Sequence, residues 1–336
     1  MNVNIDQMDH AFDVLSGFES ICNKDFKTIN AKYTQSVLRL NGCDLAAIAG
    51  QEGLGSAIKA GAKKVVEMIW NLIKGIKEFF FGSKSKIKDV QIKEIEKETK
   101  VVLQAIKKQP DLKETVENKV QQIKPSINKI ENAGTVEAIE LRFGPYVSFM
   151  TEYFNEVADA KTEGYLAAAQ TGKATLQLDW RKSDHLKLLS AFNVLSKSFQ
   201  HSNKNGKSEE IEVVAVIESI ETGSKVIEAT EKFRTVAKDV LQNVNDTLEK
   251  STIYYEKLIK DGNEHRSAEA VLKFTQSLGK AATKMSKLVA ECDNFIIQIG
   301  SAISKINKEV GGTSSKLENI VPAMTSIEDL DKFMHN

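Results

Sequence analysis

An all-α fold is predicted by three features of the sequence. Apolar residues recur every three or four positions along most of the chain, which is the spacing of one face of an α-helix. The 336 residues include only 4 prolines, so long stretches run without a helix breaker. Ala, Leu, Lys and Glu, which favour helix, are abundant. We therefore expect an elongated helical bundle with a long antiparallel helical hairpin in its C-terminal part.

Two helices are expected before residue 43. The first covers residues 6–22, with Asp6 as its candidate N-cap. The second covers residues 25–40 and ends at Asn41–Gly42. Residues 43–53 are small and Gly-rich, which predicts a hinge or loop. The apolar residues of the second helix share one side: Ile29, Tyr33, Val37 and Leu40.

The most apolar and aromatic continuous stretch is residues 54–88, LGSAIKAGAKKVVEMIWNLIKGIKEFFFGSKSKIK. It predicts a basic amphipathic helix over residues 54–81, because apolar and charged residues fall on opposite sides. Gly82–Ser83 is expected to end this helix. Pro110 and Pro125 are expected to interrupt the charged helices that follow. The apolar stripe of the amphipathic helix consists of Ile58, Ala62, Val65, Ile69, Leu72, Ile73 and Ile76.

The C-terminal part is expected to begin with a helix that Thr135 caps and that turns or kinks at residues 143–146. A polar loop is expected at residues 201–210. The hairpin is expected over residues 209–309, with a break near Gly223 and a tight turn at residues 261–263. This pattern divides the chain into an N-terminal region (1–130), a bundle with the hairpin (131–312) and a tail (313–336) with a short helix at 326–335.

Charge and motif content exclude several classes of function. Lys and Arg number 46, and so do Asp and Glu, which argues against a whole-chain nucleic-acid binder. Charge is uneven, however, because residues 51–88 hold eight Lys and three Glu. The 5 histidines lack metal-ligand spacing, and the 3 cysteines form no CxxC pair. We therefore expect no enzyme activity, no cofactor, no metal and no small-molecule substrate.

The amphipathic helix is the candidate functional surface, and three interpretations stay open. Its stripe packs against other helices while its lysines face water, or the helix lies on a membrane through its aromatic residues, or its lysines bind nucleic acid. The candidate residues for contact with a membrane or a partner are Lys59, Lys63, Lys64, Ile69, Trp70, Ile73, Lys74, Lys77, Phe79, Phe80 and Phe81.

The same stretch resembles internal head proteins of large tailed bacteriophages. The shared pattern is G-L-x-x-A-x-K-x-x-A-K-K-V-x-E-x-I-W-x-x-I-K-x-I-K-E-F-F, over residues 53–80. Such proteins are packaged with the genome inside the capsid. The resemblance implies a virion structural protein in the phage head, made in the host cytoplasm. It also implies other virion proteins or further copies of the chain as partners.

We therefore expect a non-enzymatic internal head protein, with packaged DNA or a membrane surface as further partners at residues 54–88. The alternative is a soluble, membrane-active or pore-forming helical protein that inserts through residues 54–81. A third class is an adaptor or scaffold that uses the hairpin as a coiled-coil surface.

Overall fold

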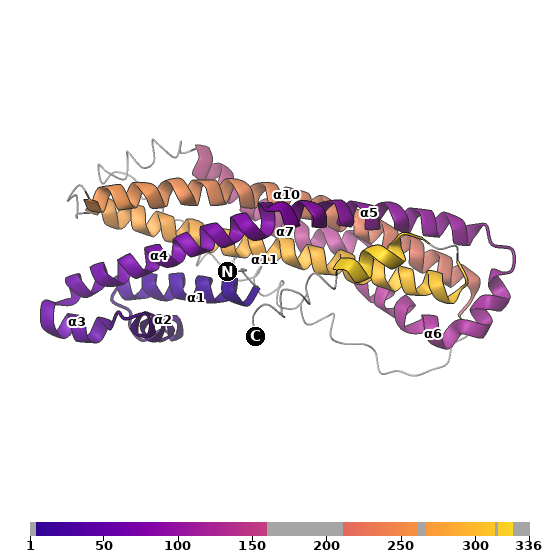
Figure 1. The fold of residues 1–336 in the computed structure, drawn as a ribbon, viewed down its shortest axis with the longest axis horizontal. Helices are drawn as coiled ribbons and strands as arrows, with labels where there is room; N and C mark the ends of the chain where they lie inside the picture. Colours follow the sequence, from indigo (N-terminus) through magenta and orange to yellow (C-terminus); the bar gives the residue numbers. More distant parts are fainter. Residues whose placement is uncertain (1–4, 160–210, 261–265, 313–314, 325–336) are drawn as a thin grey trace. The chain divides into compact units, whose positions relative to one another are not determined.

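A computed structural model of the protein describes residues 5–159, 211–260, 266–312 and 315–324. All regular secondary structure in these residues is helical, so the predicted all-α class is confirmed (Figure 1). Residues 317–324 are also helical. The main helices are α1 (Ile5–Cys22), α2 (Ile29–Leu40), α3 (Leu45–Glu52), α4 (Leu54–Phe81), α5 (Ser83–Lys107), α6 (Leu112–Ala133), α7 (Val136–Asp159), α10 (Val213–Lys260) and α11 (Arg266–Glu309).

The chain forms two compact units, and each draws on three separate stretches. Unit 1 comprises Met1–Gly82, Met150–Asp179 and Ala237–Leu288. Unit 2 comprises Ser83–Phe149, Trp180–Val236 and Val289–Asn336. Helices α7, α10 and α11 therefore each contribute to both units. The expected regions 1–130 and 131–312 were contiguous, and their boundaries stay a prediction.

In unit 1, α1 and α2 approach each other closely at Gly17. A Cβ atom added there would lie 2.0 Å from the carbonyl oxygen of Asn30 and 2.1 Å from Thr34 Oγ1. The Thr34 hydroxyl donates a hydrogen bond to the Val14 carbonyl at 3.1 Å. Thr28 caps α2 by accepting a hydrogen bond from the Ala31 amide at 3.1 Å. The side of α2 next to Gly17 thus carries small residues, and Val37 and Leu38 are buried further along the helix.

Two predictions about the first 53 residues are wrong. Residues 43–53 are not a loop, because Leu45–Glu52 forms α3. Asp44 starts that helix by accepting hydrogen bonds from the amides of Ala46 and Ala47, and this cap offsets the weak helix propensity of Gly50. Asp6 is not an N-cap, since it lies within α1.

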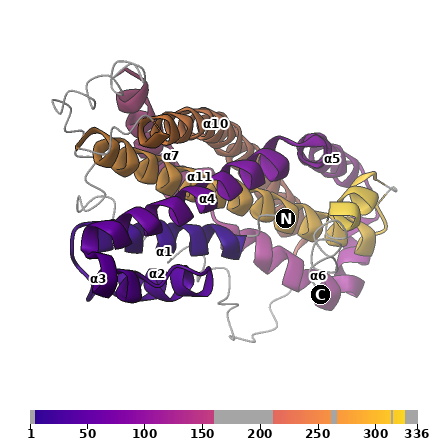
Figure 2. The same cartoon turned by 60° about the vertical axis from the view of Figure 1, so that its left-hand side comes forward.

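Helix α4 has the predicted bounds, Leu54–Phe81, and Gly82 follows it as expected. It packs against α1 and α3, with which it lies in both views (Figures 1 and 2). Among the described residues, α4 is therefore packed into unit 1.

In unit 2, Pro110 separates α5 from α6, and the Thr135 hydroxyl accepts a hydrogen bond from the Ala138 amide, both as predicted. Pro125 does not interrupt the chain, because α6 runs through it. A proline inside a helix costs about 3 kcal/mol. Buried isoleucines on both sides of it, Ile123 and Ile127, offset that cost.

The expected turn at residues 143–146 is absent as well, because α7 continues through Pro145. Its Phe143 is buried against Phe233 and Phe295, with ring centroids 6.2 and 6.3 Å apart. This aromatic contact, with buried Val147 one turn later, stabilises the helix across the proline.

Helix α10 is continuous at Gly223, so the break expected there is wrong. A Cβ atom on Gly223 would lie 3.1 to 3.2 Å from side-chain atoms of Ile303, Ile130 and Ile299. The missing side chain at Gly223 therefore allows α6 and α11 to pack closely against α10. Further along α10, Arg234 pairs with Asp293 of α11. The residue numbers thus rise on α10 as they fall on α11, so the two helices run antiparallel here.

Several predictions fall outside the described residues. They include the polar loop at 201–210, the tight turn at 261–263 and the short helix at 326–335. The hairpin as a whole therefore stays a prediction.

Candidate interaction surface on helix α4

The apolar stripe of α4 is docked in unit 1. Of its seven residues only Ile58 is partly exposed. Ile69, Ile73 and Ile76 are between 0 and 2% exposed. The stripe therefore belongs to the core of unit 1.

Small residues bring α4 close to its neighbours. A Cβ atom on Gly61 would lie 2.7 Å from a ring carbon of Phe18 in α1 and 3.1 Å from a methyl carbon of Leu45 in α3. Ala57 and Ala62 are buried on the same side. Gly61 lowers intrinsic helix propensity, and this packing compensates for it.

Two polar contacts join α4 to α10 in unit 1. The indole Nε1 of Trp70 donates a hydrogen bond to the Glu256 carboxylate at 2.9 Å. One heptad later, Lys77 Nζ lies 2.6 Å from the Glu249 carboxylate. The residue numbers rise on α4 as they fall on α10, so the two helices run antiparallel here.

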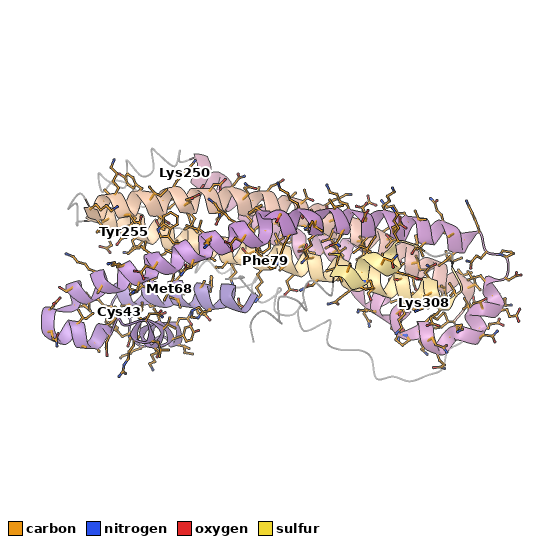
Figure 3. All side chains as sticks on the ribbon, viewed as in Figure 1. Cys43, Met68, Phe79, Lys250, Tyr255 and Lys308 are labelled. Carbon is orange, nitrogen blue, oxygen red and sulfur yellow. The ribbon has the colours of Figure 1, made fainter. Side chains whose placement is uncertain are left out.

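The three phenylalanines at the end of α4 differ in their surroundings. Phe80 is buried, whereas Phe81 and Phe79, the one labelled in Figure 3, are partly exposed. Phe79 packs edge-on against Phe80 with ring centroids 4.8 Å apart. The Lys238 ammonium lies over the Phe81 ring, 5.8 Å from its centroid. The aromatic cluster is thus partly covered rather than presented as one open patch.

The lysines of α4 face outward, in agreement with the amphipathic pattern. Lys59 and Lys63 are exposed. Lys64 pairs with Glu67 at 2.9 Å, and Lys74 lies 3.9 Å from Glu78. Neighbouring carboxylates thus compensate part of the positive charge of the helix.

Burial, and not the polar contacts, decides where α4 lies. A fully buried Ile or Phe side chain contributes roughly 1.5–3 kcal/mol. The Lys77–Glu249 pair is 46% and 33% exposed, and such pairs contribute at most about 1 kcal/mol. The buried side chains of α4 therefore outweigh the two polar contacts of Trp70 and Lys77 with α10 severalfold.

A hollow of about 440 Å³ lies between α1 and α4 within unit 1. Its apolar wall includes Val14, Leu72 and Met68, the last labelled in Figure 3. His10 and Lys74 lie at its polar side. The His10 ring nitrogen Nδ1 is 2.6 Å from the Tyr33 hydroxyl, so one of the two nitrogens of this imidazole already has a hydrogen-bond partner.

Unit 2 contains a buried cluster of charged side chains that was not predicted from the sequence. Arg234 is 3% exposed and pairs with Asp293, with Asp89 at 2.5 Å and with Glu231 at 3.6 Å. Lys88 Nζ lies 3.1 Å from Asp293. The cluster joins α5, α10 and α11 within this unit.

The carboxylates of Asp293 and Asp89 compensate the buried positive charge of Arg234. Burial by itself lowers the pKa of Arg234, but the charges of Asp293 and Asp89 outweigh it and hold the guanidinium protonated. Burial raises the pKa of Glu231, against the attraction of Arg234. A signal was present in the sequence: Ile227, Thr230 and Arg234 follow a three-then-four spacing, which places a charge in an apolar seam.

The three cysteines are free. Burial, followed by the negative charge of Glu269, raises the pKa of Cys22 to about 11. Burial also raises the pKa of Cys292. Thiolate, the reactive form, is therefore scarce at these two positions at neutral pH.

Comparison with protein-family models, with curated proteins and with solved structures found no match. Within the described ranges, no three or more His, Cys, Asp and Glu side chains group in a way that could hold a metal ion. Among the same residues no helix, α4 included, is both long and apolar enough to cross a membrane.

Proposed function

We propose that the protein is a non-enzymatic structural protein of a phage virion, carried inside the head. The observation that carries the proposal is the docked state of α4, the helix that bears the resemblance to internal head proteins. Its apolar side chains, such as Ile69 and Ile76, stabilise the protein's own fold. Exposed lysines such as Lys63 lie on the opposite side of α4, where they can make contacts inside a particle.

The partners follow from that surface. Lys59 and Lys63 are exposed on α4, and Lys84 and Lys86 are exposed at the start of α5. Weak, non-specific contact with packaged DNA needs only such exposed cations, and it does not require a net positive chain. Other virion proteins or further copies of the chain are the remaining partners.

Purified virions test the proposal directly. Mass spectrometry of particles from the phage that encodes the chain should detect the protein as a component. Exposed lysines such as Lys63 and Lys74 should react with an amine-reactive ester carried on a large dextran only after the particles are opened. Absence from the particles would sink the proposal, and labelling in intact particles would move the protein to the outer surface.

A membrane-active protein is the second candidate, and the partly exposed aromatic edge of α4 favours it. Trp70, Phe79 and Phe81 are neither fully buried nor fully open, and lysines flank them. This composition is typical of helices that lie at a lipid interface. Insertion would require lipid to replace the core contacts of the stripe.

Dye release from vesicles that contain phosphatidylserine separates the two candidates. A membrane-active protein would release dye, and Trp70→Glu would abolish release by placing a charge at the interface. Trp70→Phe is the matched control, because it keeps an aromatic, uncharged side chain while it removes the pyrrole part of the indole and its hydrogen bond to Glu256. No release by the unaltered protein would reject this candidate.

A further inference from the structure

Helix α2 exposes a row of large apolar side chains. Ile29 is 85% exposed and Leu40 is 87% exposed. Tyr33 lies between them at 41%, and Phe26 just before the helix is 36% exposed. Single exposed apolar residues are ordinary, but three along one short helix and a fourth just before it mark an interaction site.

The spacing of this row is that of a coiled-coil seam. Positions 29, 33, 36 and 40 are separated by four, three and four residues, so they alternate as d and a positions of a heptad. Ser36 is the polar member and is also exposed. A row of a and d positions is narrow, which suits packing against one other helix.

Basic residues flank the seam on one side. In the same register Lys32 and Arg39 occupy g positions, next to the apolar row. Residues 23–42 contain four basic side chains and one acidic one, Asp25. Arg39 lies 3.5 Å from Asp44, but these side chains are 76% and 41% exposed, so water screens the pair.

This charge pattern selects the occupant. A second copy packed antiparallel would bring Lys32 and Arg39 of the two chains against each other. A parallel second copy would set them against Asn30 and Val37, which offer no negative charge. An anionic lipid surface favours a wide apolar face, whereas this seam is narrow and has a serine within it.

We propose that the exposed face of α2 docks an amphipathic α-helix of a partner protein, one whose apolar seam is flanked by acidic residues. Apolar packing on Ile29 and Leu40 supplies the attraction, and pairing with Lys32 and Arg39 sets the specificity. The proposal does not depend on the virion role, because it concerns only the surface of unit 1.

A pair of designed peptides tests it with the full chain. Both have three heptads with Leu at a and d; one carries Glu at e and g, and the other carries Lys there. Fluorescence anisotropy should show binding of the Glu peptide, with the Lys peptide at least tenfold weaker. Added salt should weaken the Glu peptide and narrow the difference.

Variants tie the binding to α2. The double change Ile29→Ser and Leu40→Ser should abolish binding, and Lys32→Glu with Arg39→Glu should invert the preference between the peptides. Leu141→Ser is the matched control, since Leu141 is 79% exposed on a different helix, α7. Circular dichroism should show unchanged helicity, because the altered side chains are exposed.

Other results would overturn the proposal. Failure of both peptides to bind, equal binding of both, or binding that survives the double serine variant would each reject it. A dimer in sedimentation that becomes a monomer in the double serine variant would assign the face to a second copy. Flotation with phosphatidylserine vesicles that the same variant abolishes would assign it to lipid.

Discussion

Helices α2 and α4 both carry an apolar stripe with helical spacing, but the two stripes differ in burial. The stripe of α4 is buried, with Ile69 and Ile76 at 1% and 0% exposure. Of the stripe predicted for α2, only Val37 is buried, whereas Tyr33 is 41% exposed and Ile29 and Leu40 are above 80%. Periodicity identifies a stripe, but it does not say whether the protein covers it.

The position of the small residues explains the difference. In α4, Ala57, Gly61 and Ala62 lie on the same side as the large side chains, so close approach buries both kinds. In α2 the buried side consists of Ala31, Thr34, Val37 and Leu38, and Ile29, Tyr33 and Leu40 lie away from it. Helix α1 approaches α2 closely at the small residues of the buried side, and the side with Ile29 and Leu40 is left facing water.

The largest effect on stability is expected from a change that blocks the close packing of α1 against α2 at Gly17. Gly17→Ala would place a methyl group 2.0 Å from the Asn30 carbonyl oxygen, and a backbone atom cannot move aside without separating α1 from α2. The gain in helix propensity, about 1 kcal/mol, is smaller than the loss of packing. We expect a net destabilisation of roughly 2–4 kcal/mol in urea unfolding followed by circular dichroism.

Gly50→Ala in α3 is its control, because no atom lies within 4 Å of the added Cβ. It should be neutral or stabilising, by up to about 1 kcal/mol. Equal stability of Gly17→Ala and the unaltered protein would mean that the small side of α2 does not determine which face is buried.

Truncation of one large residue in each stripe compares the two helices directly. Ile69→Ala removes a side chain that is 1% exposed and should cost about 2–5 kcal/mol through lost burial and a cavity. Leu40→Ala removes one that is 87% exposed and should change stability by less than about 0.5 kcal/mol. Similar urea midpoints for the two variants would contradict the difference in burial.

The sequence predicts those features that depend on local chemistry. The helical class, the bounds of α4, the stop at Pro110 and the cap at Thr135 follow from periodicity, backbone geometry and side-chain hydrogen bonds near in the chain. The alternation of charge along α4 also predicts which of its residues face water.

Features that depend on packing with distant residues are not predictable in this way. Pro125, Pro145 and Gly223 read as breaks because their tertiary neighbours are unknown from one sequence. The burial of Arg234 depends on Asp293 and Asp89, which lie far away in the chain. The exposed side of α2 depends on Gly17 of α1 in the same manner.

A smaller effect is expected at the edge of the α4 stripe. Trp70→Phe keeps an aromatic ring but removes the Nε1 donor to Glu256. We expect a loss of about 1–3 kcal/mol, from the hydrogen bond to a charged carboxylate and from the smaller ring. Glu256→Gln keeps an acceptor and leaves the indole in place, so it should cost less. An equal loss in both variants would indicate that the charge of the Glu256 carboxylate, and not the size of the ring, accounts for the effect.

The smallest effect is expected for the ion pair one heptad further along. Lys77→Met keeps the aliphatic stem and removes the charge that faces Glu249, and both side chains are solvated in part. The change in unfolding free energy should stay below about 1 kcal/mol and vanish at high salt. Lys74→Met is the matched control, because Lys74 pairs only within α4, with Glu78 at 3.9 Å. If Lys77→Met cost as much as Ile69→Ala, polar contacts with α10 would hold α4 in place, and the contrast with α2 would rest on charge instead of on packing.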